Sequence, residues 1–236
     1  ATTAITTLKD NAPKPLLQGK EIYQPGRRGQ GLLVQRHAYD QVTTLSLPKF
    51  TAFPTNEGTI MFWFKPNWNE KESNAHEILC YSGEGEVEGQ PQRLLYSLKR
   101  LANGKLNLSL VIGQQKQITI PGPWAANQWL HLAFSWNSAK QDFRLYLNGK
   151  LDQAAPNTAN RPWQKIDKVD KGELWLGENG YNNYKSVVGD GIYDELLIFG
   201  QALNDADVML AAQGELEEKG GRNLAASGRP VEELSG

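Results

Sequence analysis

The 236-residue chain contains one cysteine, Cys80, so it can form neither an internal disulfide nor a cysteine-based zinc cluster. No charge of one sign dominates, because 25 Lys and Arg residues stand against 26 Asp and Glu residues. The longest apolar stretches, at 59–64 and 195–199, are far shorter than the roughly 20 residues of a membrane-spanning helix. We therefore expect no disulfide-stapled miniprotein, no zinc finger, no nucleic-acid partner and no membrane span.

The sequence is instead rich in turn formers, with 23 glycines and 12 prolines, and it shows little helical patterning. Two Asn-Gly pairs, Asn103-Gly104 and Asn148-Gly149, lie between alternating apolar runs and predict hairpins with type I′ turns. About ten strands are expected, at 42–47, 59–65, 77–82, 93–101, 105–112, 117–120, 129–136, 143–147, 173–177 and 191–199.

The pattern of these strands predicts an all-β fold, a two-sheet antiparallel jelly roll sandwich with one short C-terminal helix. Strands 59–65 and 191–199 are apolar on both faces, which is typical of central strands. The helix is expected to begin after the capping residue Asn204 and to end at Gly214. We expect a jelly roll over 29–214, an N-terminal arm or edge addition over 1–28, and a polar C-terminal arm over 215–236.

Five segments in this order resemble the laminin G-like, concanavalin A-like jelly roll domains. They are GTIMFWFKPNW (58–68), WLHLAFSW (129–136), LYLNGK (145–150), LWLG (174–177) and GIYDELLIF (191–199), the last followed by Ala202-Leu203. The resemblance implies two curved antiparallel sheets, frequent sugar binding and, in some relatives, calcium. It does not fix which function applies, because one fold serves many.

Catalysis is not expected, although the resemblance extends to laminarinase-type glycosidases that carry Glu-x-Asp-x-Glu on one strand face. Acid and nucleophile must flank one bond, and the sequence has no such motif. The nearest cluster, Glu84, Glu86 and Glu88, lies in a glycine-rich stretch that predicts a flexible, solvated loop. We also expect Cys80 to be a small buried residue and His131 to be structural.

The adjacent acids Asp194 and Glu195 point to opposite faces if the strand alternates, so at least one faces apolar neighbours. A buried carboxylate needs a partner, either Arg, Lys, backbone amides or a metal ion. Hydrogen bonding to a neighbouring loop is the structural alternative. If a cofactor is bound, we expect calcium, held by the candidate metal ligands Asp194, Asp190 and Asp40.

Sugar binding requires aromatic faces together with amides that donate to and accept from hydroxyls. Two loops and a weaker third patch at 161–163 provide these groups; the alternative is that their aromatic rings fill the rim of the core. The candidate ligand-binding residues are Asn67, Trp68, Asn69, Trp163, Tyr181, Asn182, Asn183 and Tyr184.

These observations favour a non-catalytic, lectin-like module that binds a glycan or a glycoprotein surface. The alternative is a structural or assembly protein of a particle or surface, such as a virion decoration, tail component or adhesin, whose terminal arms contact neighbouring subunits. Both hypotheses favour an extracellular, cell-surface or virion-surface location.

Overall fold

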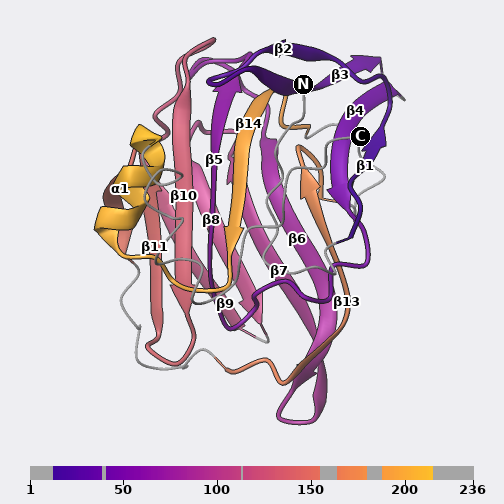
Figure 1. Cartoon of the computed structure of the whole chain (residues 1–236), viewed down its shortest axis with the longest axis vertical. Helices are drawn as coiled ribbons and strands as arrows, with labels where there is room; N and C mark the ends of the chain where they lie inside the picture. The colour runs from indigo at the N-terminus through magenta and orange to yellow at the C-terminus, as the bar shows by residue number, and fades with distance from the viewer. Residues whose placement is uncertain (1–12, 39–40, 113, 155–163, 180–187, 215–236) are drawn as a thin grey trace.

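The computed structural model describes residues 13–38, 41–112, 114–154, 164–179 and 188–214. Fourteen strands and one helix form in these ranges (Figure 1). They are β1 (Leu16–Gln18), β2 (Tyr23–Pro25), β3 (Gln30–Ala38), β4 (Gln41–Leu47), β5 (Glu57–Pro66), β6 (His76–Val87), β7 (Gln90–Arg100), β8 (Leu106–Ile112), β9 (Gln114–Ile120), β10 (Leu130–Asn137), β11 (Asp142–Leu147), β12 (Lys150–Ala154), β13 (Lys168–Leu176), β14 (Gly191–Phe199) and α1 (Asp205–Gln213).

The strands form two layers of antiparallel sheet. Sheet A has the order β12-β11-β10-β5-β14-β3, with β2 paired to β3, and sheet B has the order β4-β13-β6-β7-β8-β9, with β1 paired to β4. In Figure 1 sheet A faces the viewer and carries α1, while β6 to β9 lie behind it. The hairpin of β3 and β4 joins the two layers through continuous hydrogen bonding. The predicted jelly roll sandwich with a short C-terminal helix is confirmed.

The core lies between the two sheets and follows the alternation of the strands. Phe62 and Phe64 of β5 and Phe134 of β10 meet Tyr81 and Tyr96 of sheet B in one buried cluster. β5 and β14 have neighbours on both sides, as the apolar character of both their faces predicted. Because alternate residues point away from this core, each sheet also presents an outer face.

One of the two predicted turns is type I′ and the other is not. Asn148 and Gly149 both have positive φ, 50° and 78°, as this turn requires. At the other turn only Gly104 has positive φ, 82°, and its N–H donates to Leu101 O at 2.9 Å. This is a type I turn followed by a glycine bulge, so the hairpin was predicted correctly and its turn type was wrong.

The helix covers part of the outer face of sheet A, with Val208 packed against Met61, Ala133 and Tyr146. The Asn204 side chain accepts the N–H of Asp207, and Gly214 ends the helix with φ 79°. The predicted caps are therefore both confirmed.

Two expectations about strands differ from the structure. No ranges were predicted for β1, β2, β3 or β12, although the Asn148-Gly149 hairpin implied β12. Residues 13–28 add β1 and β2 to the edges of β4 and β3, the edge addition that was one of the two expectations for 1–28. The stretch 83–89 is not a flexible loop, because Glu84 and Glu86 pair across the long hairpin of β6 and β7. The C-terminal arm 215–236 lies outside the described residues.

The alternation of β14 is broken by a bulge. Glu195 has φ 52°, and the register with β5 shifts between Asp194 and Leu197. As a result Tyr193 and Leu196 both enter the core, three residues apart. The strict alternation assumed for Asp194 and Glu195 was therefore wrong, since a bulge inserts one unpaired residue.

Candidate functional site

The connection between β5 and β6, residues 67–75, meets the segment 188–190 at one end of the sandwich. The Asn67 side chain donates from Nδ2 to Asp190 Oδ1 at 3.0 Å, and its backbone N–H donates to Asp190 O at 3.1 Å. A predicted sugar-binding residue and a predicted metal ligand are thus neighbours. Asn67 is exposed and Asn69 is half-buried, so this pair of amides lies at the surface of the loop end.

Trp68 does not present the exposed face that sugar stacking would need. Its side chain is 5% exposed, its Nε1 donates to Gly189 O at 2.8 Å, and its ring stacks on His76 with centroids 4.5 Å apart. Trp124 packs edge-on against it at 4.8 Å. The indole fills the rim of the core, which was the alternative reading of these aromatic residues, and an exposed ring at this position was a wrong expectation.

His76, at the start of β6, also contacts the segment 188–190. Its Nδ1 lies 2.7 Å from Val188 O, and because a carbonyl only accepts, Nδ1 carries the proton. Burial lowers the pKa of His76 below its ordinary value, although the hydrogen bond to Val188 opposes this shift. The residue is therefore neutral near pH 7 and acts as a structural pin between β6 and residue 188.

Arg100, at the end of β7, holds the loop 67–75 from inside. Its side chain is fully buried, and its two terminal nitrogens donate to five backbone carbonyls, those of Asn69, Glu70, Glu72, Asn74 and Leu101. The guanidinium lies over the Trp68 ring, 5.4 Å from the centroid. Burial lowers the pKa of Arg100, but its ordinary value is so high that the group stays charged.

Asp194 is buried, as one of the two adjacent acids had to be, and its partners are backbone amides. Oδ2 accepts the N–H of Arg28 at 2.9 Å, and Oδ1 accepts the N–H of Glu195 at 2.9 Å. The described residues contain no group of three or more His, Cys, Asp or Glu side chains that could hold a metal ion. Asp40 lies outside the described residues, so calcium binding at Asp194, Asp190 and Asp40 stays a prediction.

The predicted aromatic loop is described only at its base. Trp163, Tyr181, Asn182, Asn183 and Tyr184 lie outside the described residues, and their ligand roles stay predictions. At the base the Gly177 N–H donates to Ile78 O at 3.0 Å and the Gly189 N–H donates to Gly177 O at 2.9 Å. Residues 177 and 189 are thereby fixed next to the first residues of β6.

The structure adds a set of polar side chains that was not among the predicted site residues. We name it the polar band: Glu77 of β6, Ser97 and Lys99 of β7, Asn107 and Ser109 of β8, and Thr119 of β9. The pairs Glu77–Lys99, Lys99–Asn107, Asn107–Thr119 and Ser97–Ser109 are in register. Because the leucines between them point into the core, the polar band lies on the outer face of sheet B.

Hydrogen bonds run along the polar band. Ser97 Oγ donates to Glu77 Oε1 at 2.6 Å, and Ser109 Oγ donates to Asn107 Oδ1 at 2.7 Å. Asn107 Nδ2 donates to Thr119 Oγ1 at 2.8 Å. Thr119 Oγ1 also accepts from Gln117 Nε2 at 3.1 Å and keeps its own O–H donor, while the two serine hydroxyls keep acceptor capacity and the amide keeps a second donor. This is the mixture of donors and acceptors that saccharide hydroxyls require.

Glu77 is the carboxylate of the polar band, and it is 3% exposed. Burial raises its pKa above the ordinary value, while Lys99, 3.6 Å away, and the Ser97 hydroxyl oppose this shift. A two-carboxylate glycosidase mechanism needs a second acid facing the first across the substrate. The polar band supplies one carboxylate, Glu77, which is one fewer than this mechanism requires.

The polar band adjoins the base of the aromatic loop. Glu77 is hydrogen-bonded to Asn179, and Cys80, on the same outer face, directs its Sγ toward Asn179 O at 4.0 Å. Burial raises the pKa of the Cys80 thiol well above its usual range, so this cysteine is unreactive, as expected of a buried one. The alternation of polar residues with leucines over 106–110 was the sequence signal for this face.

The two curved antiparallel layers, with a polar outer face beside a loop end, define a lectin-type β-sandwich. The model of the concanavalin A-like lectin/glucanases superfamily (Laminin_G_3) matches residues 37–209, and the chain belongs to this family. No curated protein matches the sequence. The described residues contain no helix that is long and apolar enough to cross a membrane.

Solved structures share the fold at low identity. Domain 4 of AbnA, a GH43 extracellular arabinanase from Geobacillus stearothermophilus solved in complex with arabinotriose, matches with a TM-score of 0.57 and 18% identity, over 86% of this chain and 90% of that domain. The receptor binding domain of botulinum neurotoxin D matches with a TM-score of 0.57 and 15% identity, over 89% of this chain and 52% of that one. The chain thus spans about half of the toxin domain. At these identities the likeness shows the fold alone.

Proposed function

We propose that this domain is a non-catalytic, lectin-like module that binds an uncharged glycan along the polar band of sheet B. The observation that carries the proposal is the row of hydroxyl and amide groups from three adjacent strands, Ser97, Asn107, Ser109 and Thr119, on a face that points away from the core. Thr119 is exposed and the other three are 5% exposed or less, so the glycan would contact the polar band at Thr119. A similarly folded arabinanase domain was solved with arabinotriose, which supports a saccharide as ligand without transferring its site.

The alternative, assembly through the terminal arms, has less support. Residues 13–28 pair with the domain's own strands β3 and β4, and residues 1–12 and 215–236 lie outside the described residues. Contacts with neighbouring subunits stay a prediction.

A glycan array at neutral pH, with and without calcium, tests the proposal and identifies the sugar. The diagnostic variant is Thr119→Val, which removes an exposed hydroxyl from the polar band at constant size. Loss of one or two hydrogen bonds should weaken the binding of the glycan about fivefold to tenfold.

The matched control is Thr51→Val, at an exposed threonine between β4 and β5 and outside the polar band. It should bind the glycan as the parent chain does. Absence of any glycan binding, or equal losses in the two variants, would overturn the proposed site. Glycan binding that is detected only in the presence of calcium would support the predicted metal ligands Asp194, Asp190 and Asp40.

A further inference from the structure

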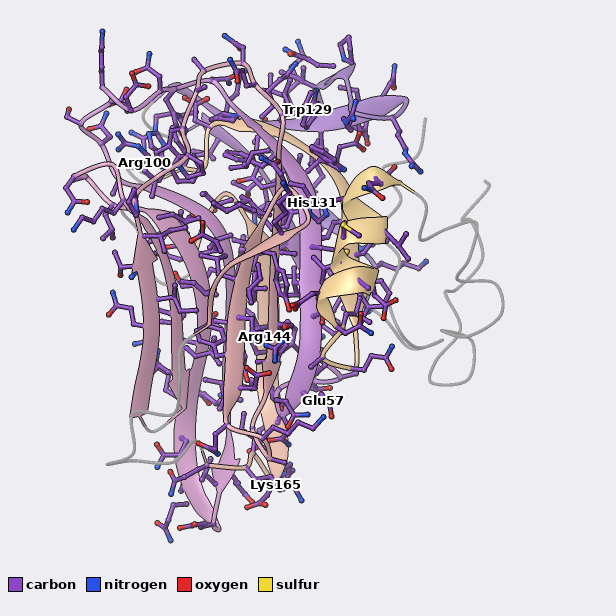
Figure 2. All side chains as sticks on the ribbon, turned by 90° about the vertical axis from the view of Figure 1, so that its left-hand side faces the viewer. Glu57, Arg100, Trp129, His131, Arg144 and Lys165 are labelled. Carbon is purple, nitrogen blue, oxygen red and sulfur yellow. The ribbon has the colours of Figure 1, made fainter. Side chains whose placement is uncertain are left out.

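A second patch of aromatic and charged side chains lies on the opposite side of the sandwich, on the outer face of sheet A. Trp63 and Lys65 stand two residues apart on β5, and Trp129, just before β10, stands two residues from His131 of β10. His131 is in register with Trp63, so the four side chains share one face. With Arg27 they form what we name the cation–aromatic patch; Figure 2 shows Trp129 and His131 beside the upper end of α1, away from Arg100.

Each tryptophan of this patch has a cation over its ring. Arg27 Cζ lies 4.9 Å from the Trp63 centroid, and Lys65 Nζ lies 5.1 Å from the Trp129 centroid. Such contacts hold a cation at an exposed position with about 0.5–1 kcal/mol each. Arg27 is exposed, and Lys65 and both tryptophans are half-buried, so the charged groups are accessible to solvent.

Neither cation is neutralised at this surface by an ion pair within the described residues. The acid that pairs with Trp63 across the strands is Asp194, which is 4% exposed and whose two oxygens accept backbone N–H groups of Arg28 and Glu195. The patch therefore presents two oriented positive charges on aromatic supports. An anionic group placed between them would be attracted by both.

His131 supplies a neutral polar atom beneath the patch. The residue is 2% exposed, its ring meets Trp63 edge-on at 5.2 Å, and no hydrogen-bond partner reaches its buried Nδ1 from the described residues. Burial lowers the pKa of His131 to about 4, so the ring is uncharged at neutral pH. An unpartnered buried polar atom costs free energy that a ligand hydroxyl can recover.

We propose that the cation–aromatic patch is a separate binding site for an acidic saccharide, a sugar carrying a carboxylate or a sulfate. The anionic substituent would pair with Arg27 and Lys65, which the indoles hold in place. This site differs from the polar band in face and in ligand charge, and it stands independently of the proposed function. We favour an anionic sugar over a membrane surface because both tryptophans are half-buried and each has a cation over its ring, so the patch offers no exposed apolar face to insert into lipid.

The test measures binding of the full chain to polygalacturonate, dextran sulfate, neutral dextran and phosphatidylserine vesicles by titration calorimetry, at low and at physiological ionic strength. We expect binding to one or both acidic polymers, weakened by salt, and none to neutral dextran. The first two probes distinguish a carboxylate from a sulfate as the recognised group.

The diagnostic variant is Arg27→Gln combined with Lys65→Gln, and the matched control is Lys105→Gln combined with Lys165→Gln, two exposed lysines outside the patch. We expect the first pair to weaken binding of the acidic polymer at least about tenfold and the control to change it less than about twofold. Urea unfolding of both variants verifies that the fold is retained.

Absence of binding to both acidic polymers would overturn the proposal, as would equal losses in the two double variants, which would indicate diffuse attraction. Binding to the vesicles alone would replace the saccharide with a membrane surface. Because Thr119 lies on the other sheet, the Thr119→Val variant should bind the acidic polymer normally, so failure of one site does not imply failure of the other.

Discussion

Replacing the glycine in each of three hairpin turns by alanine separates backbone strain from crowding. Gly89, Gly104 and Gly149 have φ values of 71°, 82° and 78°, so the conformational penalty for a Cβ is nearly the same at each. Their surroundings differ. A Cβ on Gly89 would have nothing within 4 Å, and one on Gly104 would meet Glu70 O at 3.7 Å. A Cβ on Gly149 would lie 2.8 Å from Ala212 Cβ and 3.1 Å from Met209 Cα, both on α1.

The left-handed conformation costs an alanine about 1–2 kcal/mol. The reduced freedom of the unfolded chain returns about 0.4–1 kcal/mol, which leaves a net loss near 1 kcal/mol for Gly89→Ala and Gly104→Ala. Crowding against the backbone of α1 adds about 1–3 kcal/mol for Gly149→Ala. We therefore expect the free energy of unfolding to fall by about 2–4 kcal/mol for Gly149→Ala, two to four times the loss at the other turns.

Urea unfolding curves measure the three losses directly. A double-mutant cycle with Ala212→Gly tests the assigned contact, because removing the Ala212 methyl group should cost less in the Gly149→Ala background than in the parent chain. Equal destabilisation at the three turns, or no coupling in the cycle, would show that α1 is not seated on the turn of β11 and β12.

Three further outcomes follow from the described contacts. With the pKa of His131 at about 4, the unfolded chain binds a proton between about pH 6.5 and 4 that the native chain does not. The free energy of unfolding therefore falls as pH drops through this window. In His131→Gln, urea unfolding should show a smaller slope of this free energy against pH, by an amount equivalent to at most one bound proton. Trypsin should cut after exposed Lys20, between β1 and β2, well before Arg28, which bonds to Asp194 and Gly214, and mass spectrometry of early fragments showing the reverse order would contradict this. Reducing-sugar assays on β-glucans should detect no hydrolysis, and activity abolished by Glu77→Gln would refute the binding-only interpretation.

Strands in which apolar residues alternate regularly with other residues were predictable, because this alternation indicates which face of the strand is buried. The segment 129–136 alternates large apolar residues with small ones, and β10 forms there with its leucines and Phe134 in the core. β3 was missed because its sequence, QGLLVQRHA, is apolar only in the middle and polar at both ends. This strand forms because it pairs with β14 and β4, and its own sequence pattern does not indicate that pairing.

The candidate site was less predictable because it depends on contacts between distant segments. Trp68 follows Pro66 between two asparagines, which suggested an exposed ring, yet Gly189 and His76 enclose it from another part of the chain. The bulge at Glu195 likewise has no turn residue to mark it. The polar band arises when small polar residues of three strands come into register, and register is fixed by the whole sheet.

The buried Arg100 gives the loop 67–75 a cation that cannot dissociate. Five carbonyl oxygens converge on one guanidinium, an arrangement in which a loop is commonly wrapped around a bound ion. Because this positive charge is covalently attached, its local concentration does not change with dilution, chelators or the calcium content of the medium. The loop therefore keeps this internal cation under conditions that would strip a bound metal ion from a metal-organised loop.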